Sequence, residues 1–175
     1  FFWEVNDQIK GKQREDLTPR ILQLWKNIYE RVEKSDLEEK EKIYSNLSKF
    51  MKYFERIDDE IAPLLKASAP YVNHSFNVPF FLEELNRLKN YSQSKETAMH
   101  IGDILMSMLK EFTPDFQESD IKELVSYMYA FKEENEIRDL ADSICAEYTR
   151  RGKDFLRELY KENRYPYRIR EWFIT

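Results

Sequence analysis

Glycine and cysteine are scarce in this sequence, and each scarcity excludes a class of protein. The chain has 3 glycines, and neither G-x-x-x-x-G-K-[ST] nor G-x-G-x-x-G occurs, so it offers no loop that could hold the phosphates of a nucleotide. Cys145 is the only cysteine, which excludes an intrachain disulfide and gives no sign of an oxidising compartment. We therefore expect a cytoplasmic protein.

Long apolar runs and turn signals for β-hairpins are also missing. The chain contains no run of about 18 apolar residues, so we expect no membrane-spanning helix and no membrane partner. Asn-Gly and Asp-Gly pairs and runs of β-branched residues are absent, which argues against β-sheets.

Apolar residues recur at intervals of three and four along most of the chain, the spacing that lines one face of an α-helix. This pattern predicts an all-α fold of antiparallel helix pairs, with residues 1–175 forming a single domain. The predicted core contains one large apolar residue from each of six helices: Trp25, Leu47, Phe81, Leu105, Leu124 and Ile144.

Capping signals suggest where individual helices begin and end. Thr18 followed by Pro19 predicts the start of the first complete helix, because the missing N–H of proline costs nothing in the first turn. Ser35 and Glu38 resemble a capping box, and Ser94 predicts a further start. Gly152 predicts the end of the helix that contains Cys145.

Alternate helices are expected to start near Thr18, Asp58, Ser94 and Glu134, at spacings of roughly 36 to 40 residues. Over about residues 18–162 this rhythm resembles HEAT and armadillo repeats, although no repeat consensus matches residue by residue. The chain is also similar to helical C-terminal regions of large bacterial defence proteins, in which repeats sense or scaffold while another domain performs the chemistry. These resemblances imply a short α-solenoid; the alternative is a compact helical bundle, because ordinary helix pairs also give spacings near 40.

The two ends are expected to differ from the body of the domain. Residues 1–12 are interpreted as the end of an incoming helix, and the absence of an initial Met suggests a fragment of a larger protein. Residues 163–175, where the helical pattern stops, are interpreted as a C-terminal tail that packs on the last helix or reaches into a following domain.

No set of residues predicts catalysis, a metal site or another cofactor. His74 and His100 are the only histidines, and neither lies in an H-E-x-x-H or E-x-x-H frame. Glu96 and His100 are one helical turn apart and could share an ion, but surface Glu–His pairs at this spacing are common. Cys145 lies on an apolar stripe, where we expect a buried small hydrophobe and not a nucleophile.

Two segments are candidate binding regions. The connector between two helix pairs is unusually apolar and aromatic, and its candidate partner-binding residues are Tyr71, Asn73, His74, Phe76 and Asn77. The same residues could instead seal the core beneath the loop.

The C-terminal end is basic, with eight basic and four acidic residues from Thr149 onward. This net +4 leaves −9 on the preceding part, since the whole chain carries −5. Aromatic residues alternate with arginines here, a combination that can bind single-stranded nucleic acid or acidic peptides. The candidate basic patch contains Arg150, Arg151, Arg157, Arg164, Arg168 and Arg170.

These features together favour a non-enzymatic protein-interaction or scaffold module, whose partner is another protein or another domain of the same chain. One alternative is a nucleic-acid-binding domain that uses the basic end. The acidic body of the chain argues against this alternative, because it would repel a polyanion. The other alternative is an accessory domain of a larger enzyme.

Overall fold

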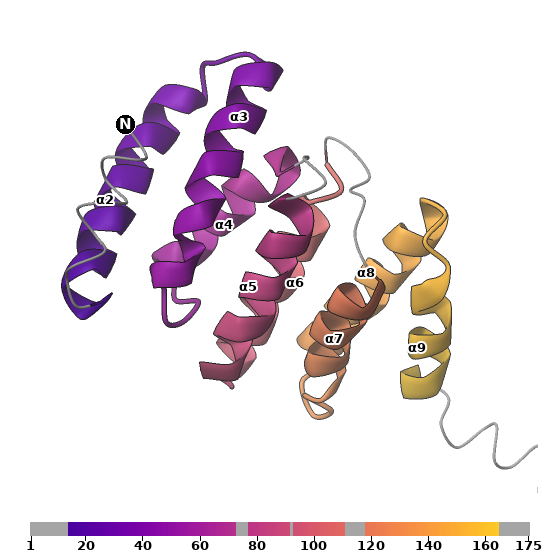
Figure 1. Ribbon diagram of the computed structural model, residues 1–175. Helices are drawn as coiled ribbons and strands as arrows, with labels where there is room; N and C mark the ends of the chain where they lie inside the picture. Colours follow the sequence, from indigo (N-terminus) through magenta and orange to yellow (C-terminus); the bar gives the residue numbers. More distant parts are fainter. Residues whose placement is uncertain (1–13, 73–76, 92, 111–117, 165–175) are drawn as a thin grey trace, which may run out of the picture.

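The computed structural model describes residues 14–72, 77–91, 93–110 and 118–164 (Figure 1). These residues form α-helices, two short 3-10 helices and connecting turns, with no β-strand among them. The predicted all-α class is confirmed. The elements are α2 (Arg14–Val32), α3 (Leu37–Ser48), η1 (Lys49–Tyr53), α4 (Ile61–Ser68), η2 (Ala69–Tyr71), α5 (Asn77–Tyr91), α6 (Lys95–Ser107), α7 (Glu118–Tyr129), α8 (Asn135–Arg150) and α9 (Phe155–Arg164).

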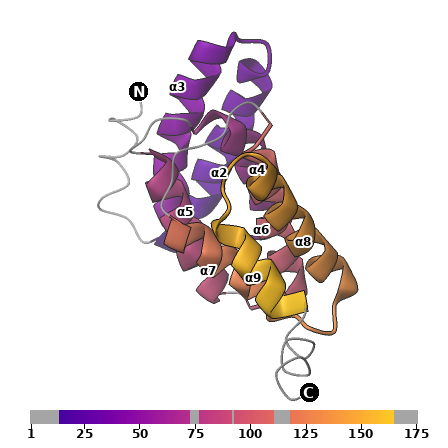
Figure 2. The same cartoon turned by 90° about the vertical axis from the view of Figure 1, so that its right-hand side faces the viewer.

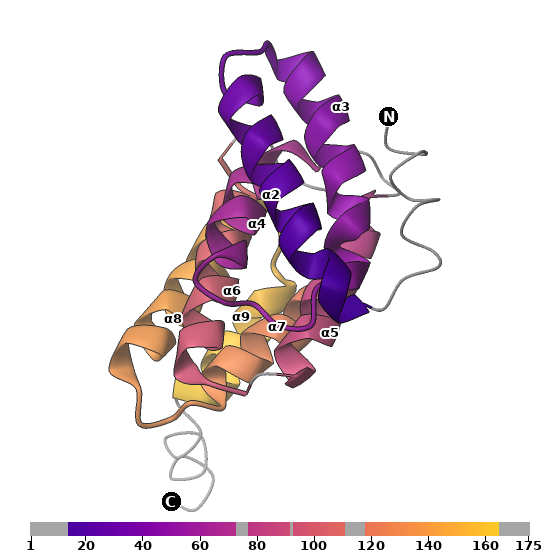
Figure 3. The ribbon, with the colours of Figure 1, turned by 90° about the vertical axis from the view of Figure 1, so that its left-hand side faces the viewer.

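The helices are arranged in two layers that advance along one direction. In one layer α2 packs on α4, α4 on α6 and α6 on α8; in the other α3 packs on α5, α5 on α7 and α7 on α9. Figure 3 views the stack from the α2 end and shows α4, α6 and α8 on one side, with α5 and α7 on the other. The extensive contacts of α2 are limited to α3, α4 and η1. A compact bundle would bring α2 against α8, and no such extensive contact is found among the described residues, so the arrangement is compatible with a helical repeat.

In the first layer α4, α6 and α8 start at residues 61, 95 and 135, which gives intervals of 34 and 40 residues. These starts lie within three residues of the expected ones at Asp58, Ser94 and Glu134. In the second layer α3 and α9 start at residues 37 and 155.

One continuous apolar core fills the space between the layers. All six predicted core residues are buried, and none of them exposes more than 1% of its surface. Trp25 stacks on Phe54 with ring centroids 5.7 Å apart, which joins α2 to the segment after η1. The prediction of these six core residues is confirmed.

Two predicted helix ends are confirmed in atomic detail. Ser94 caps α6, because its hydroxyl oxygen accepts a hydrogen bond of 3.2 Å from the backbone N–H of Thr97. Gly152 follows the end of α8 with a φ of 85°, the left-handed conformation that glycine adopts most easily. The Gly152 N–H donates to Thr149 and the Lys153 N–H to Tyr148, which completes a Schellman motif.

Two predicted helix starts are wrong. Pro19 lies inside α2, which already includes Arg14, so Thr18 does not cap this helix. The second helix is capped by Asp36 and not by Ser35: Oδ1 of Asp36 accepts from the Glu39 N–H at 2.9 Å. The reason is local, since the Ser35 N–H donates to Val32 and ties Ser35 to the turn that ends α2.

The α6–α8 interface is close and mainly apolar. A Cβ atom on Gly102 of α6 would collide with the side chain of Leu140 on α8, and would lie 2.7 Å from Cε of Met128 on α7. The hydroxyl of Tyr148 crosses this interface and donates to the Leu105 carbonyl at 3.3 Å. The helices approach because position 102 has no side chain.

The α5–α7 interface is held by polar groups. Nζ of Lys89 lies 2.6 Å from Oε1 of Glu123 and donates to Oδ1 of Asn86 at 3.0 Å. The amide of Asn86 in turn donates to the carbonyl of Asp120 at 3.2 Å. Lys89 and Asn86 are buried, with 5% and 8% of their surfaces exposed, so the interface encloses a charged group.

Candidate interaction surfaces

The connector after η2 is the first of the predicted binding regions. Asn73, His74 and Phe76 lie outside the described residues, and Asn77 is the first residue of α5, with no described side chain. Tyr71 is half-buried, and its ring stacks on the fully buried ring of Tyr44 with centroids 5.3 Å apart. Tyr71 therefore packs on the core at the edge of the second layer.

The predicted basic patch is divided by the structure. Arg168 and Arg170 lie outside the described residues, and the side chain of Arg164, the last residue of α9, is not described. Arg151 is half-buried beside Tyr148, and its positive charge opposes the burial that raises the pKa of that tyrosine.

Arg150 and Arg157 remain exposed at the surface, and each has a carboxylate partner. Nη2 of Arg150 lies 2.8 Å from Glu147, and Nη2 of Arg157 lies 3.3 Å from Asp154. The bond from Arg150 lowers the pKa of Glu147 below its usual value. Both guanidinium groups therefore belong to local ion pairs, and their contribution to a positive field is reduced.

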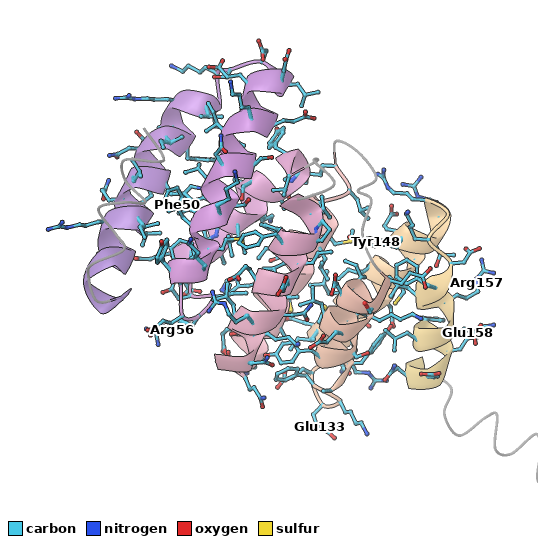
Figure 4. All side chains as sticks on the ribbon, viewed as in Figure 1. Phe50, Arg56, Glu133, Tyr148, Arg157 and Glu158 are labelled. Atoms are coloured by element: carbon cyan, nitrogen blue, oxygen red, sulfur yellow. The ribbon has the colours of Figure 1, made fainter. Side chains whose placement is uncertain are left out.

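A groove of about 640 Å³ runs between α8 and α9, on the last helix pair that the structure describes. We call it the α8–α9 groove. Figure 2 shows the two helices side by side, and Figure 4 places Arg157 on the outer side of α9 and Tyr148 on the side toward the core. The residues that line the groove are Asp142, Ser143, Cys145, Ala146, Thr149, Arg150, Arg157 and Tyr160.

The groove results from the two faces of α8. One face is apolar and buried against α6 and α7. The other carries small side chains, Ser143, Ala146 and Thr149, at intervals of three residues. After the Schellman turn at Gly152, α9 folds back beside this small-residue face and contributes Tyr160. The walls are largely apolar as a result.

The charges of the groove lie at its ends. Asp142 is near the middle of α8, whereas Arg150 is its last residue and Arg157 belongs to the first half of α9. The carboxylate of Asp142 accepts a hydrogen bond of 2.7 Å from the hydroxyl of Tyr129. The groove thus has a small and largely apolar middle, with a hydrogen-bonded carboxylate at one end and ion-paired arginines at the other.

Cys145 forms part of the groove floor, and only 2% of its surface is exposed. Its sulfur lies 3.6 Å from the Tyr129 hydroxyl, and burial raises the pKa of the thiol to about 11. Since thiolate is the nucleophilic form, the group is unreactive near neutral pH. The prediction that Cys145 is a buried member of the apolar stripe is confirmed.

A second depression, of about 300 Å³, lies where the N-terminal turns of α6 and α8 meet. Nε2 of His100 lies 3.0 Å from Oδ1 of Asp59 there, and Lys95 faces Glu134 at 4.0 Å. Within the part of the chain that the structure describes, no group of three or more His, Cys, Asp or Glu side chains is placed to hold a metal ion.

The α8–α9 groove was not predicted from the sequence, although part of its signal is there. The small residues of α8 form a second stripe beside the apolar one, and α9 is strongly amphipathic. Periodicity shows which residues avoid water, but it does not show which outward faces a turn will bring together.

A comparison of the chain with protein-family models, curated proteins and solved structures finds no match. None of the helices in the described ranges has the length and apolar character needed to cross a membrane.

Proposed function

We propose that this chain is a non-enzymatic protein-interaction module in which a HEAT-like stack of helices forms the scaffold and the α8–α9 groove receives an apolar helical segment. The observation that carries the proposal is the groove itself, whose middle is lined by small and largely apolar side chains. The spacing of the first-layer starts, at residues 61, 95 and 135, and the packing of helices on nearest neighbours support the repeat organisation.

The position of the groove favours a helix as its occupant. Along the first layer, α4 packs between α2 and α6, and α6 packs between α4 and α8. The next helix of this layer would lie against the other side of α8, which is where the groove runs. Solenoids bury each repeat against the following one, so a helix placed here would continue the stack.

The dimensions also suit a helix. From Asp142 to Arg150 the groove follows α8 for about 12 Å, or slightly more than two helical turns. Small residues such as Ala146 allow a second helix to approach closely, since interhelical distances of about 8 to 10 Å depend on the side chains at the contact. A partner in this groove would be another protein or another part of the same chain.

Photocrosslinking tests this proposal directly. Benzoylphenylalanine in place of Ala146 lies in the groove, and the same replacement of Ala130, an exposed alanine just after α7, is the matched control. We expect a defined adduct from position 146, within the chain or with one protein, and none from position 130. The absence of an adduct at 146, or the same adducts at both positions, would contradict the proposal.

A further inference from the structure

We propose that the α8–α9 groove receives an amphipathic helix of another protein, which docks parallel to α8 and carries a basic residue facing Asp142, with large apolar residues four and eight positions later. The inference rests on the proposed function of the groove as a site for a helical segment, and it adds the orientation and the chemistry of that segment. It follows from a comparison of the groove with the site that α8 itself occupies on α6.

The groove lies on the side of α8 that is turned away from α6. Leu140 faces α6, because a Cβ atom on Gly102 would collide with its side chain. At about 100° per residue, Asp142 and Thr149 point about 200° and about 180° away from Leu140 around the helix. The groove is therefore where α8 would receive the next helix of its layer, as α6 receives α8.

The two helices are also equivalent in register. α6 begins at residue 95 and α8 at residue 135, so equivalent positions differ by 40 residues. Two residues of α6 that contact α8 directly are Gly102 and Leu105. The equivalent positions on α8 are Asp142 and Cys145, and both line the groove. α9 forms the other wall, as α7 does for α8, so a helix in the groove would repeat the placement of α8.

The side chains at these equivalent positions differ, and the difference defines the partner. Where α6 has Gly102, which makes room for Leu140, α8 has Asp142. A carboxylate at this point disfavours a leucine, since burying a charge against an apolar side chain is costly, and it favours a basic side chain. Asp142 accepts a hydrogen bond from Tyr129, and a carboxylate accepts several such bonds at once.

Beyond Asp142 the groove suits large apolar side chains. α6 has Met106 and Leu109 at positions where α8 has the smaller Ala146 and Thr149. A helix parallel to α8 brings the residues four and eight positions after its basic residue to this part of the groove, because positions i, i+4 and i+8 share one side of a helix. Large apolar side chains at these positions fill the space above Ala146.

α8, which occupies the equivalent site on α6, provides the probe. A 16-residue peptide with the sequence of residues 135–150 has Ile144 and Tyr148 four and eight positions after Leu140. Leu140→Lys in the peptide gives the proposed partner, and Thr149→Lys, on the opposite side of the helix, gives a control of equal charge. Each peptide carries a fluorescent label and is titrated with the full chain, and fluorescence anisotropy measures the Kd.

We expect the Leu140→Lys peptide to bind about fivefold more tightly than the Thr149→Lys peptide, the size of preference that a partly exposed ion pair gives. Asp142→Asn in the protein should reduce this preference to within about twofold, because it removes the charge and keeps the size of the side chain. Asp139→Asn, the same change at an exposed position of α8 outside the groove, should leave the preference unchanged. Thermal melting verifies that both protein variants fold, and the comparison of the two peptides on the unaltered chain depends on neither.

Equal affinities of the two peptides for the unaltered chain, or no binding of either, would overturn the inference. A preference that persists in Asp142→Asn would also overturn it, because another group would then recognise the added charge. So would an adduct that benzoylphenylalanine at position 146 forms within the chain and that the Leu140→Lys peptide does not displace.

Crosslinking from position 146 without a peptide separates failure of this inference from failure of the proposed function. A defined adduct together with equal peptide affinities leaves the groove as an interaction site whose partner has a different chemistry. The absence of any adduct removes the proposed function itself.

Discussion

The α6–α8 and α5–α7 interfaces each join successive helices of one layer, yet they are built from different chemistry. In the first, α6 approaches closely through Gly102, and the contact is mainly apolar. In the second, the buried ammonium of Lys89 joins α5 to Glu123 and Asn86. The two layers are therefore held together by different types of interaction.

The difference lies in how each interface fixes the position of its helices. Tight apolar packing tolerates little change in volume, because protein interiors are packed as densely as organic crystals. The ion pair of Lys89 gains little net stability, since desolvation of its buried ammonium offsets much of the attraction to the largely exposed Glu123. The α6–α8 interface should therefore be the more sensitive of the two to substitution.

The largest effect is expected from Leu105→Ala on α6. Leu105 is fully buried, and removing most of its side chain leaves a cavity, so we expect the free energy of unfolding to fall by about 2 to 5 kcal/mol. Chemical denaturation measures the change. Leu37→Ala, at the 51% exposed start of α3, is the control and should change stability far less. Equal losses in the two variants would contradict the assignment of the core.

A smaller loss, of about 1 to 3 kcal/mol, is expected from Gly102→Val, because the new side chain would overlap Leu140 and Met128. Leu140→Ala in the same protein makes room and should restore part of the stability. A double-mutant cycle from denaturation curves gives the coupling between the two positions. If the two effects simply add, the close approach at Gly102 does not determine the interface.

Alkaline pH should also weaken the apolar region around α8, with a smaller effect. Burial raises the folded-state pKa of Cys145 from 9.0 to about 11, and it also raises the pKa values of Tyr129 and Tyr148. A group whose pKa is raised in the folded state stabilises the protein fully below its unfolded-state pKa, and this stabilisation is lost as the pH rises through its folded-state pKa. For Cys145 the loss should begin near pH 9 and continue through pH 11.

For Cys145 alone the expected loss is about 1 kcal/mol by pH 10. Denaturation midpoints at pH 7, 9 and 10 measure it. Cys145→Ala changes the packing at every pH, but it should remove this part of the pH dependence. A wild-type midpoint that stays constant up to pH 10 would contradict the burial of these groups.

The smallest effect is expected in the other interface, from Lys89→Met. The replacement keeps much of the aliphatic length and removes the buried ammonium, while Glu123 is largely exposed and can be solvated by water. We expect a change within about 1 kcal/mol, of either sign, together with weaker dependence on salt. A loss as large as that of Leu105→Ala would show that the polar interface is the main source of stability.

The fold could be predicted from the sequence wherever the type and spacing of a residue indicate its environment directly. The apolar stripes identified Trp25 and Leu105 as core, and Gly152 marked a helix end because its left-handed φ suits glycine. The start of α3 was misplaced by one residue, because Ser35 and Asp36 are both good caps. The two candidate caps are distinguished only by the hydrogen bond that the Ser35 N–H donates to Val32 at the end of α2.

The candidate surfaces were harder to predict, because they depend on contacts between distant residues. Composition grouped Arg150 and Arg157 with other basic residues, but their partners Glu147 and Asp154 lie one helical turn away and change their electrostatic role. The groove needs α9 to turn back along α8, and the sequence indicates the turn at Gly152 without indicating its direction.

The exclusive packing of each helix on its near neighbours has a consequence for how the protein folds. Tyr148 and Leu105, which connect successive helices of one layer, are only 43 residues apart in the chain. A contact of this separation closes a loop of moderate length, and it does not require the two ends of the chain to meet. During synthesis the α2–α4 region can close its part of the core while residues 118–164 are still to be made. Each later helix can then pack on the exposed apolar face of helices that have already folded.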